Sequence, residues 1–129
     1  MTKKITIINQ WIEKADHDLG TAKITYLHIP EYKDTVTFHC QRTVEKLLKA
    51  YLIFLDIEFR FTHDLVYLID LISQKDQFTN EFYDKASFLQ DFAVEVRYPD
   101  DTVELKDKDV EDAIGYAEQF RKLITEKII

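Results

Sequence analysis

The chain has 129 residues, a length typical of one domain that can bury a substantial core. Its two glycines and two prolines are too few for an all-β fold or a glycine-rich phosphate loop, so the composition predicts long helices with few joints. A net charge of −7 argues against non-specific coating of nucleic acid, although it is compatible with a local basic patch.

No secretion signal and no apolar run of membrane-spanning length can be recognised in the sequence. We therefore expect a cytoplasmic protein that does not contact a membrane. The single cysteine, Cys40, cannot form an internal disulfide. It falls on the apolar face of a predicted helix, as a small core residue does.

Apolar residues that recur at steps of three and four predict five amphipathic helices in one domain spanning residues 1–129. Asp34 or Thr35 is expected to cap the second helix, and Thr62 the third, with Asp64 in its first turn. Pro99 is expected to end the fourth helix. The predicted helices cover residues 5–26, 35–57, 63–75, 80–97 and 107 to near the C-terminus.

Helices joined by short connections predict an all-α, up-and-down bundle. The second helix is expected at its centre because the segment from Tyr51 to Leu55 is apolar all round, and such a segment is buried on several sides. In the first helix, Asp16 and Asp18 are expected mainly on the outer side. Gly20 weakens that helix slightly and could let a neighbouring helix approach closely.

Four aromatic residues fall off the core-facing stripes of their helices: Tyr67, Phe88, Phe92 and Tyr116. Exposed aromatics in this number predict a second buried surface, most simply a homodimer interface. The alternative is that some of them belong to the core of an irregular bundle.

A polar stripe runs along the second helix, where His39, Arg42, Lys46 and Lys49 recur at helical steps. The simplest interpretation is a solvated helix face with local pairing between Glu45 and Lys49. The alternative is that these side chains line a groove and meet an anion.

Known catalytic and metal-binding patterns are scarce. No His-x-x-x-His or Glu-x-x-His pair shares a helix, so neither a metal site nor a cofactor is expected. No serine-nucleophile motif is present, and Cys40 on an apolar face is a poor nucleophile. The remaining polar candidates are His39, His63 and Arg97. Arg97 could bind an anion from a helix end or pair with Asp100, and His63 could bond its own backbone.

Four segments carry a family resemblance: Trp11-x-x-x-Ala15-x-x-Asp18-Leu19, Phe38-His39-x-Gln41-x-x-x-Glu45-Lys46-x-Leu48-Lys49-Ala50, His63-Asp64-Leu65 and Arg97-Tyr98-Pro99-Asp100. With these segments, in this order, the chain resembles the HEPN family, the "higher eukaryotes and prokaryotes nucleotide-binding" domain. The resemblance covers nearly the whole chain.

The resemblance implies a helical bundle that often dimerises and that is often encoded beside, or bound to, a minimal nucleotidyltransferase. Some members are metal-independent ribonucleases that use an arginine and a histidine separated by four to six residues. The histidine there acts as acid and base, and the arginine holds the phosphate. This chain departs from that pattern, because positions 102–104 are Thr, Val and Glu and no histidine follows His63.

The resemblance therefore predicts a module that binds a nucleotide, an RNA end or a partner, and that acts with a minimal nucleotidyltransferase in a toxin–antitoxin-like pair. The alternative is a ribonuclease with a rearranged His/Arg site. Glu45, Asp64 and Asp100 could instead neutralise the cations internally. The expected binding residues are His39, Arg42, Lys46, Lys49, His63, Asp64, Arg97 and Asp100.

Overall fold

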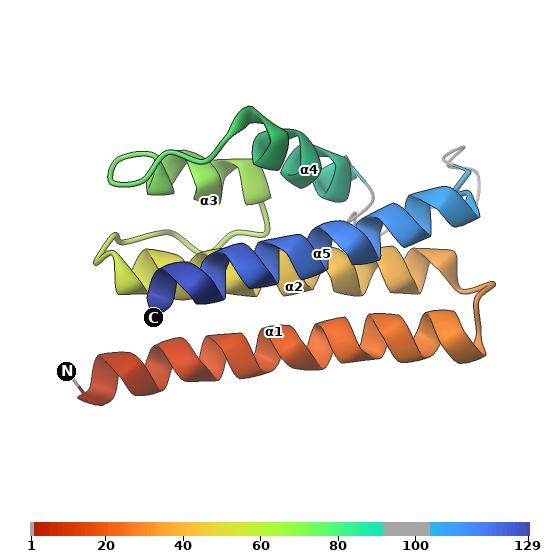
Figure 1. Ribbon diagram of the computed structural model, residues 1–129, viewed down its shortest axis with the longest axis horizontal. Helices are drawn as coiled ribbons and strands as arrows, with labels where there is room; N and C mark the ends of the chain where they lie inside the picture. Colours follow the sequence, from red (N-terminus) through yellow and green to blue (C-terminus); the bar gives the residue numbers. More distant parts are fainter. Residues whose placement is uncertain (1, 92–103) are drawn as a thin grey trace.

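Helices make up the architecture of the computed structural model, which describes residues 2–91 and 104–129. Three long helices lie side by side along the long axis, and two short ones cover the side of α2 that faces away from α1 (Figure 1). Within the described ranges there is no strand, so the predicted all-α bundle is confirmed. The helices are α1 (Thr2–His28), α2 (Lys33–Phe54), α3 (Leu65–Ile72), α4 (Asn80–Asp91) and α5 (Asp107–Ile128).

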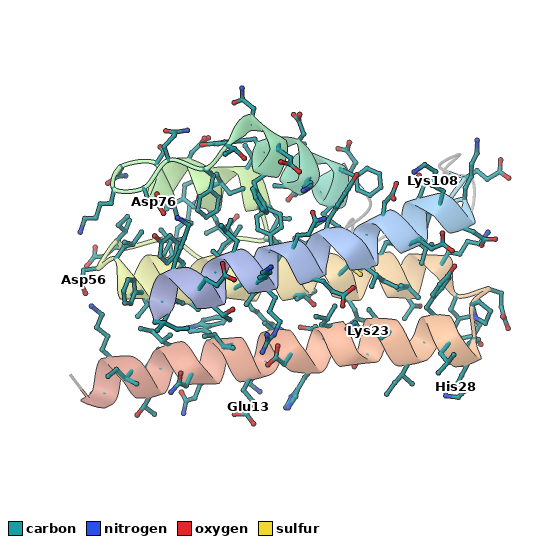
Figure 2. All side chains as sticks on the ribbon, viewed as in Figure 1. Glu13, Lys23, His28, Asp56, Asp76 and Lys108 are labelled. Carbon is teal, nitrogen blue, oxygen red and sulfur yellow. The ribbon has the colours of Figure 1, made fainter. Side chains whose placement is uncertain are left out.

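The first helix is amphipathic, and its apolar side lies along α2. Ala15, Leu19 and Ala22 are buried at spacings of four and three residues, which places them on one helix face. Glu13 and His28 point away from the bundle (Figure 2). The two faces together fix the rotation of α1 about its axis, and so decide which of its polar residues can reach α2.

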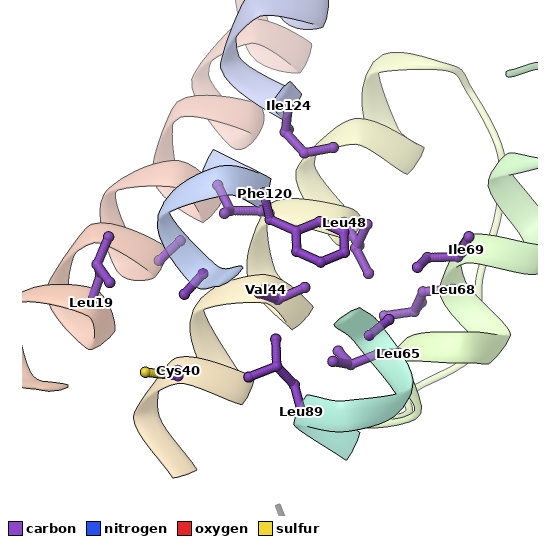
Figure 3. Close-up of a cluster of buried hydrophobic side chains, with 14 of the residues drawn as sticks. Leu19, Cys40, Val44, Leu48, Leu65, Leu68, Ile69, Leu89, Phe120 and Ile124 are labelled. Atoms are coloured by element: carbon purple, nitrogen blue, oxygen red, sulfur yellow. The ribbon is translucent and has the colours of Figure 1, made fainter. Parts of the chain in front are cut away.

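The second helix is central, as predicted, because it packs against each of the other four helices. Its buried Val44 and Leu48 meet apolar side chains from several elements in one cluster (Figure 3). That cluster includes Leu65, Leu68 and Ile69 of α3, Leu89 of α4, and Phe120 and Ile124 of α5. Charged side chains on α2 can therefore be partly or wholly enclosed by neighbouring elements.

The start of the third helix differs from the prediction. Asp64, not Thr62, is the N-cap, and its side chain accepts a hydrogen bond from Tyr67 N at 3.1 Å. Thr62 Oγ1 instead accepts from Asp64 N at 3.0 Å, which shapes the turn before the helix. Both residue types cap helices well, so local preference alone does not separate them. The helix ends at Ile72, three residues before the predicted end.

The second helix begins earlier than predicted, at Lys33, so neither Asp34 nor Thr35 is its cap. Tyr32 takes the N-cap position without a side-chain cap bond. Asp34 lies in the first turn, where a carboxylate is favourable beside the positive end of the helix dipole. The part of the fourth helix predicted beyond Asp91, and Pro99 after it, lie outside the described residues.

Three of the four surplus aromatics are accounted for within one chain. Tyr67, Phe88 and Tyr116 are partly buried against the core. The rings of Phe88 and Tyr116 also meet edge to face, with centroids 5.3 Å apart. Phe92 lies outside the described residues. These three residues therefore pack in an irregular core, as the alternative expected, and do not themselves require a second copy. The homodimer stays a prediction.

Two further expectations concern helix surfaces. A Cβ added at Gly20 would meet nothing within 4 Å, so no described element approaches closely there. None of the helices in the described part of the chain is long and apolar enough to cross a membrane.

Candidate functional site

Three charged residues on one side of α2 are buried. Arg42, Glu45 and Lys49 follow one another at steps of three and four, and their exposed fractions are 8%, 3% and 3%. Charged side chains are rarely this buried unless they are paired. This part of the polar stripe is therefore not the solvated face that the simplest interpretation expected.

The Glu45 carboxylate is the hub of this buried group. Its Oε1 accepts from Arg42 Nη1 at 2.8 Å and from His63 Nδ1 at 2.8 Å. Its Oε2 accepts from Lys49 Nζ at 2.9 Å. Burial alone would raise the pKa of Glu45. The hydrogen bonds from Lys49 and His63, together with the charges of Lys49 and Arg42, outweigh burial and hold the pKa below its usual value.

His63 lies in the connection between α2 and α3, and this connection places its imidazole beside the Glu45 carboxylate. Gln41, fully buried on α2, donates from Nε2 to the His63 carbonyl at 2.8 Å and so anchors the connection. His63 also contacts Arg42 Nη1 through its Nδ1. Its side chain is 37% exposed, so the ring contacts the buried Glu45 on one side and the solvent on the other.

A second carboxylate serves the other half of the stripe. Asp18 of α1 bonds His39 Nδ1 at 2.8 Å and also accepts from Lys46 Nζ. Its side chain is only 13% exposed, so the prediction that Asp18 lies on the outer side of α1 is wrong. The reason is packing, because the polar flank of α1 next to Leu19 is turned toward α2.

The cations of the stripe are thus offset by Asp18 and Glu45. Asp64, which was expected to be a possible counter-charge, is exposed and caps α3. Arg97 and Asp100 lie outside the described residues. Among the described contacts, these two carboxylates bond three cations, Arg42, Lys46 and Lys49.

Aromatic rings surround the buried cations. The Arg42 guanidinium lies 4.8 Å from the ring centroid of Phe38. The Lys49 ammonium lies 5.5 Å from the ring of Trp11 and 5.4 Å from that of Phe61. Such cation–π contacts attract the two cations electrostatically in a partly dry site.

Sequence reasoning missed several members of this site. Asp18, Gln41 and Glu45 were not among the expected binding residues, nor was Trp11. All four occur in the segments that carry the HEPN resemblance, so the signal was in the motif itself. Phe61 lies outside those segments and had no such signal.

Other chemistries find little support in the described part of the chain. No group of three or more acidic, histidine or cysteine side chains there could hold a metal ion. Burial raises the pKa of the Cys40 thiol to about 12, so the thiolate is scarce at neutral pH. The arrangement is suited to holding an anion beside an exposed histidine and a partly exposed lysine.

Comparisons with known proteins identify the family and the fold. The HEPN domain model matches residues 8–128. An archaeal HEPN homologue, ST0689, has the same fold with a TM-score of 0.77 at 24% identity, covering 95% of this chain and 98% of that one. The protein TT1696 from Thermus thermophilus also gives 0.77, at 20% identity and with 93% and 97% covered. No curated protein matches. Because the family model spans nearly the whole sequence, the chain belongs to the HEPN domain family.

Proposed function

We propose that this HEPN domain binds a phosphate-bearing ligand, a nucleotide or an RNA end, over the face formed by His39, Lys46 and His63. The observation that carries the proposal is the gathering of cations and histidines around the two carboxylates Asp18 and Glu45. A phosphate group accepts charge-assisted hydrogen bonds, and the side chains of His39, Lys46 and His63 are partly exposed and can donate them.

We further propose that the domain acts with a minimal nucleotidyltransferase, in a toxin–antitoxin-like pair, and that it forms a homodimer. The support is the family resemblance, since members of this family are often encoded beside such an enzyme. Co-expression with a neighbouring nucleotidyltransferase, followed by co-purification, tests the partnership. Separate elution of the two proteins at micromolar concentration would contradict it.

Binding is tested by titrating labelled 5′-phosphorylated RNA and AMP into the protein and following fluorescence anisotropy. Lys46→Met should weaken binding about tenfold, the effect of losing one charge-assisted hydrogen bond. It should also lower the slope of log K against log salt by about 0.7 for RNA. Lys108→Met is the matched control, because Lys108 is 82% exposed near the N-terminal end of α5 (Figure 2). If both variants bind like wild type, the proposed face is wrong.

A ribonuclease is the second candidate, favoured by one contact. Arg42 Nη1 meets His63 Nδ1, so an arginine and a histidine lie together although they are far apart in sequence. Arg42 and His63 also both bond the Glu45 carboxylate, which holds the two side chains together. Incubation of the purified protein with RNA in EDTA tests this candidate. Cleavage that is lost in His63→Ala but kept in His28→Ala would replace the binding proposal with a catalytic one.

A further inference from the structure

We propose that Phe61 is a stacking platform for the nucleobase of the ligand, with the phosphate of the same nucleotide lying toward His63. This inference rests on the proposed function and deepens it, because it names the ligand as a nucleobase that carries a phosphate. It assigns a binding role to the connection between α2 and α3, which the family resemblance did not mark at this position.

The exposure of Phe61 is the first observation. Its side chain is 85% exposed, whereas Tyr32, the other aromatic residue that is largely exposed in the described chain, is at 52%. Exposure of an apolar ring to water is unfavourable, and the exposed ring is available to a ligand. The residues on either side of it, Arg60 and Thr62, are polar. The exposed ring is therefore flanked in the sequence by two polar residues.

One side of the ring is fixed by the protein. The Lys49 ammonium lies 5.4 Å from the Phe61 centroid. The His63 ring meets it edge-on at 5.2 Å with an interplanar angle of 73°. These two contacts hold the orientation of the ring. With 85% of the side chain exposed, its other face remains open for stacking.

Several contacts order the support beneath the ring. Lys49 is 3% exposed, bonds Glu45 at 2.9 Å, and also lies over the ring of Trp11. The connection itself is tied to α2 by Gln41 and to α3 by the Tyr67 hydroxyl, which accepts from Arg60 N at 3.4 Å. A platform already ordered before binding loses little conformational entropy when a base stacks on it.

A nucleobase fits this surface better than an apolar protein segment. Aromatic rings interleaved with cations bind single-stranded nucleic acid by stacking and by contacts with the backbone phosphates. Here the exposed ring is next to Arg60 and near the partly exposed His63. The Asp64 carboxylate, which would repel a phosphate, is engaged by the backbone of α3. Docking of an apolar protein segment would make no use of the cations at the ring, Lys49 against one face and Arg60 beside it in the sequence.

A hollow of about 260 Å³ adjoins Trp11 and is lined by Ile7, Gln10, Trp11 and Lys14. It shares Trp11 with the support of the platform, and Lys14 adds a cation at its rim. This hollow gives the experiment a way to separate a mononucleotide from an RNA end. A longer ligand can use Lys14, whereas a single nucleotide stacked on Phe61 does not need it.

The test compares three probes: AMP, 5′-phosphorylated tetra-adenylate RNA, and ribose 5-phosphate, which has no base. Quenching of the single tryptophan, Trp11, reports binding, and calorimetry checks it. Phe61→Ala should weaken AMP and RNA binding about five- to 150-fold, the range of one base–aromatic stack. Its affinity for ribose 5-phosphate should stay unchanged. In calorimetry, which is unaffected by the added tryptophan, Phe61→Trp should bind like wild type. Phe61→Leu should bind like Phe61→Ala. Tyr32→Ala is the matched control and should change nothing.

The outcomes separate this inference from the proposed function. If wild type binds none of the three probes, the phosphate site and the platform both fail. If Lys46→Met weakens AMP binding while Phe61→Ala does not, the platform is wrong and the phosphate site stands. Wild-type affinity in Phe61→Leu would show apolar contact without stacking and would overturn the platform. So would a loss of dimer mass in Phe61→Ala, since a second copy would then cover the ring.

Two results would support the platform and identify the source of the base. Tighter binding of the tetranucleotide than of AMP, reduced toward the AMP value by Lys14→Met, indicates an RNA end. Equal affinity for both, lost in Phe61→Ala and unaffected by Lys14→Met, indicates a mononucleotide.

Discussion

Glu45→Gln should destabilise the domain far more than its small change in shape implies. The substitution keeps the size of the side chain and removes its charge. Arg42 and Lys49, which are 8% and 3% exposed, then remain buried as cations without their carboxylate. Breaking a buried ion pair in this way costs about 3–5 kcal/mol. A domain of this size is stable by about 5–15 kcal/mol, so the loss is a large fraction of the total.

The loss is measured by urea and thermal unfolding, followed by far-ultraviolet circular dichroism. At about 4 °C per kcal/mol, the melting temperature should fall by about 12–20 °C. Glu13→Gln is the matched control, because Glu13 is 70% exposed and points away from the bundle (Figure 2), and it should stay within about 0.5 kcal/mol of wild type. Equal unfolding midpoints for Glu45→Gln and wild type would refute the idea that this carboxylate holds two buried cations.

The same residue predicts a dependence on pH. The pKa of Glu45 is lowered in the folded state, so the unfolded chain binds its proton at higher pH than the folded chain does. Stability from this group is therefore fully present above the unfolded pKa of about 4.3, and it is lost as pH falls through the folded value. The stability gap between wild type and Glu45→Gln should narrow in that acid range. A gap that is constant with pH would contradict the assignment.

Three other predictions concern the bundle. Leu48→Asp should leave no cooperative unfolding transition, because Leu48 is fully buried and an unpaired charge there costs several kcal/mol; a folded variant would refute the central place of α2. Gly115→Ala should raise stability by about 0.5–1 kcal/mol in urea unfolding, since Gly115 lies inside α5 and an added Cβ meets nothing within 4 Å; a lower midpoint would contradict this. Light scattering at micromolar concentration should give twice 15.4 kDa, and a monomer mass would count against the homodimer.

The helices and the place of α2 could be predicted because they depend on local periodicity. The apolar steps of α5 gave its bounds, and the stretch from Tyr51 to Leu55 placed α2 at the centre. Tyr51 and Leu52 are buried, whereas Ile53 is only partly buried, so the stretch is less enclosed than its composition indicated. Periodicity identifies the buried face of a helix, but it does not say which neighbour covers its edges.

The site could be predicted only in part, for the same physical reason. The pairing of Glu45 with Lys49 is local and was expected from their spacing. The bond from His63 to Glu45 depends on the path of the connection after α2, and the bond from Asp18 to His39 depends on the rotation of α1. Neither path nor rotation follows from single-helix patterns, so the contacts of His63 with Glu45 and of His39 with Asp18 were not predicted.

The buried charges themselves argue for a role beyond stability. A well-packed apolar replacement of a buried ion group is often as stable as the original, or more so, by about 1–4 kcal/mol. Arg42→Met, Glu45→Leu and Lys49→Met combined should therefore fold about as well as wild type, although Glu45→Gln alone does not. The triple variant keeps Phe61 and Lys46 but removes the charges beneath them, so phosphate and base binding should both fall. If the triple variant binds the ligand like wild type, then Arg42, Glu45 and Lys49 serve only the fold. In that case His39 and Lys46, the partners of Asp18, hold the ligand without help from these buried charges.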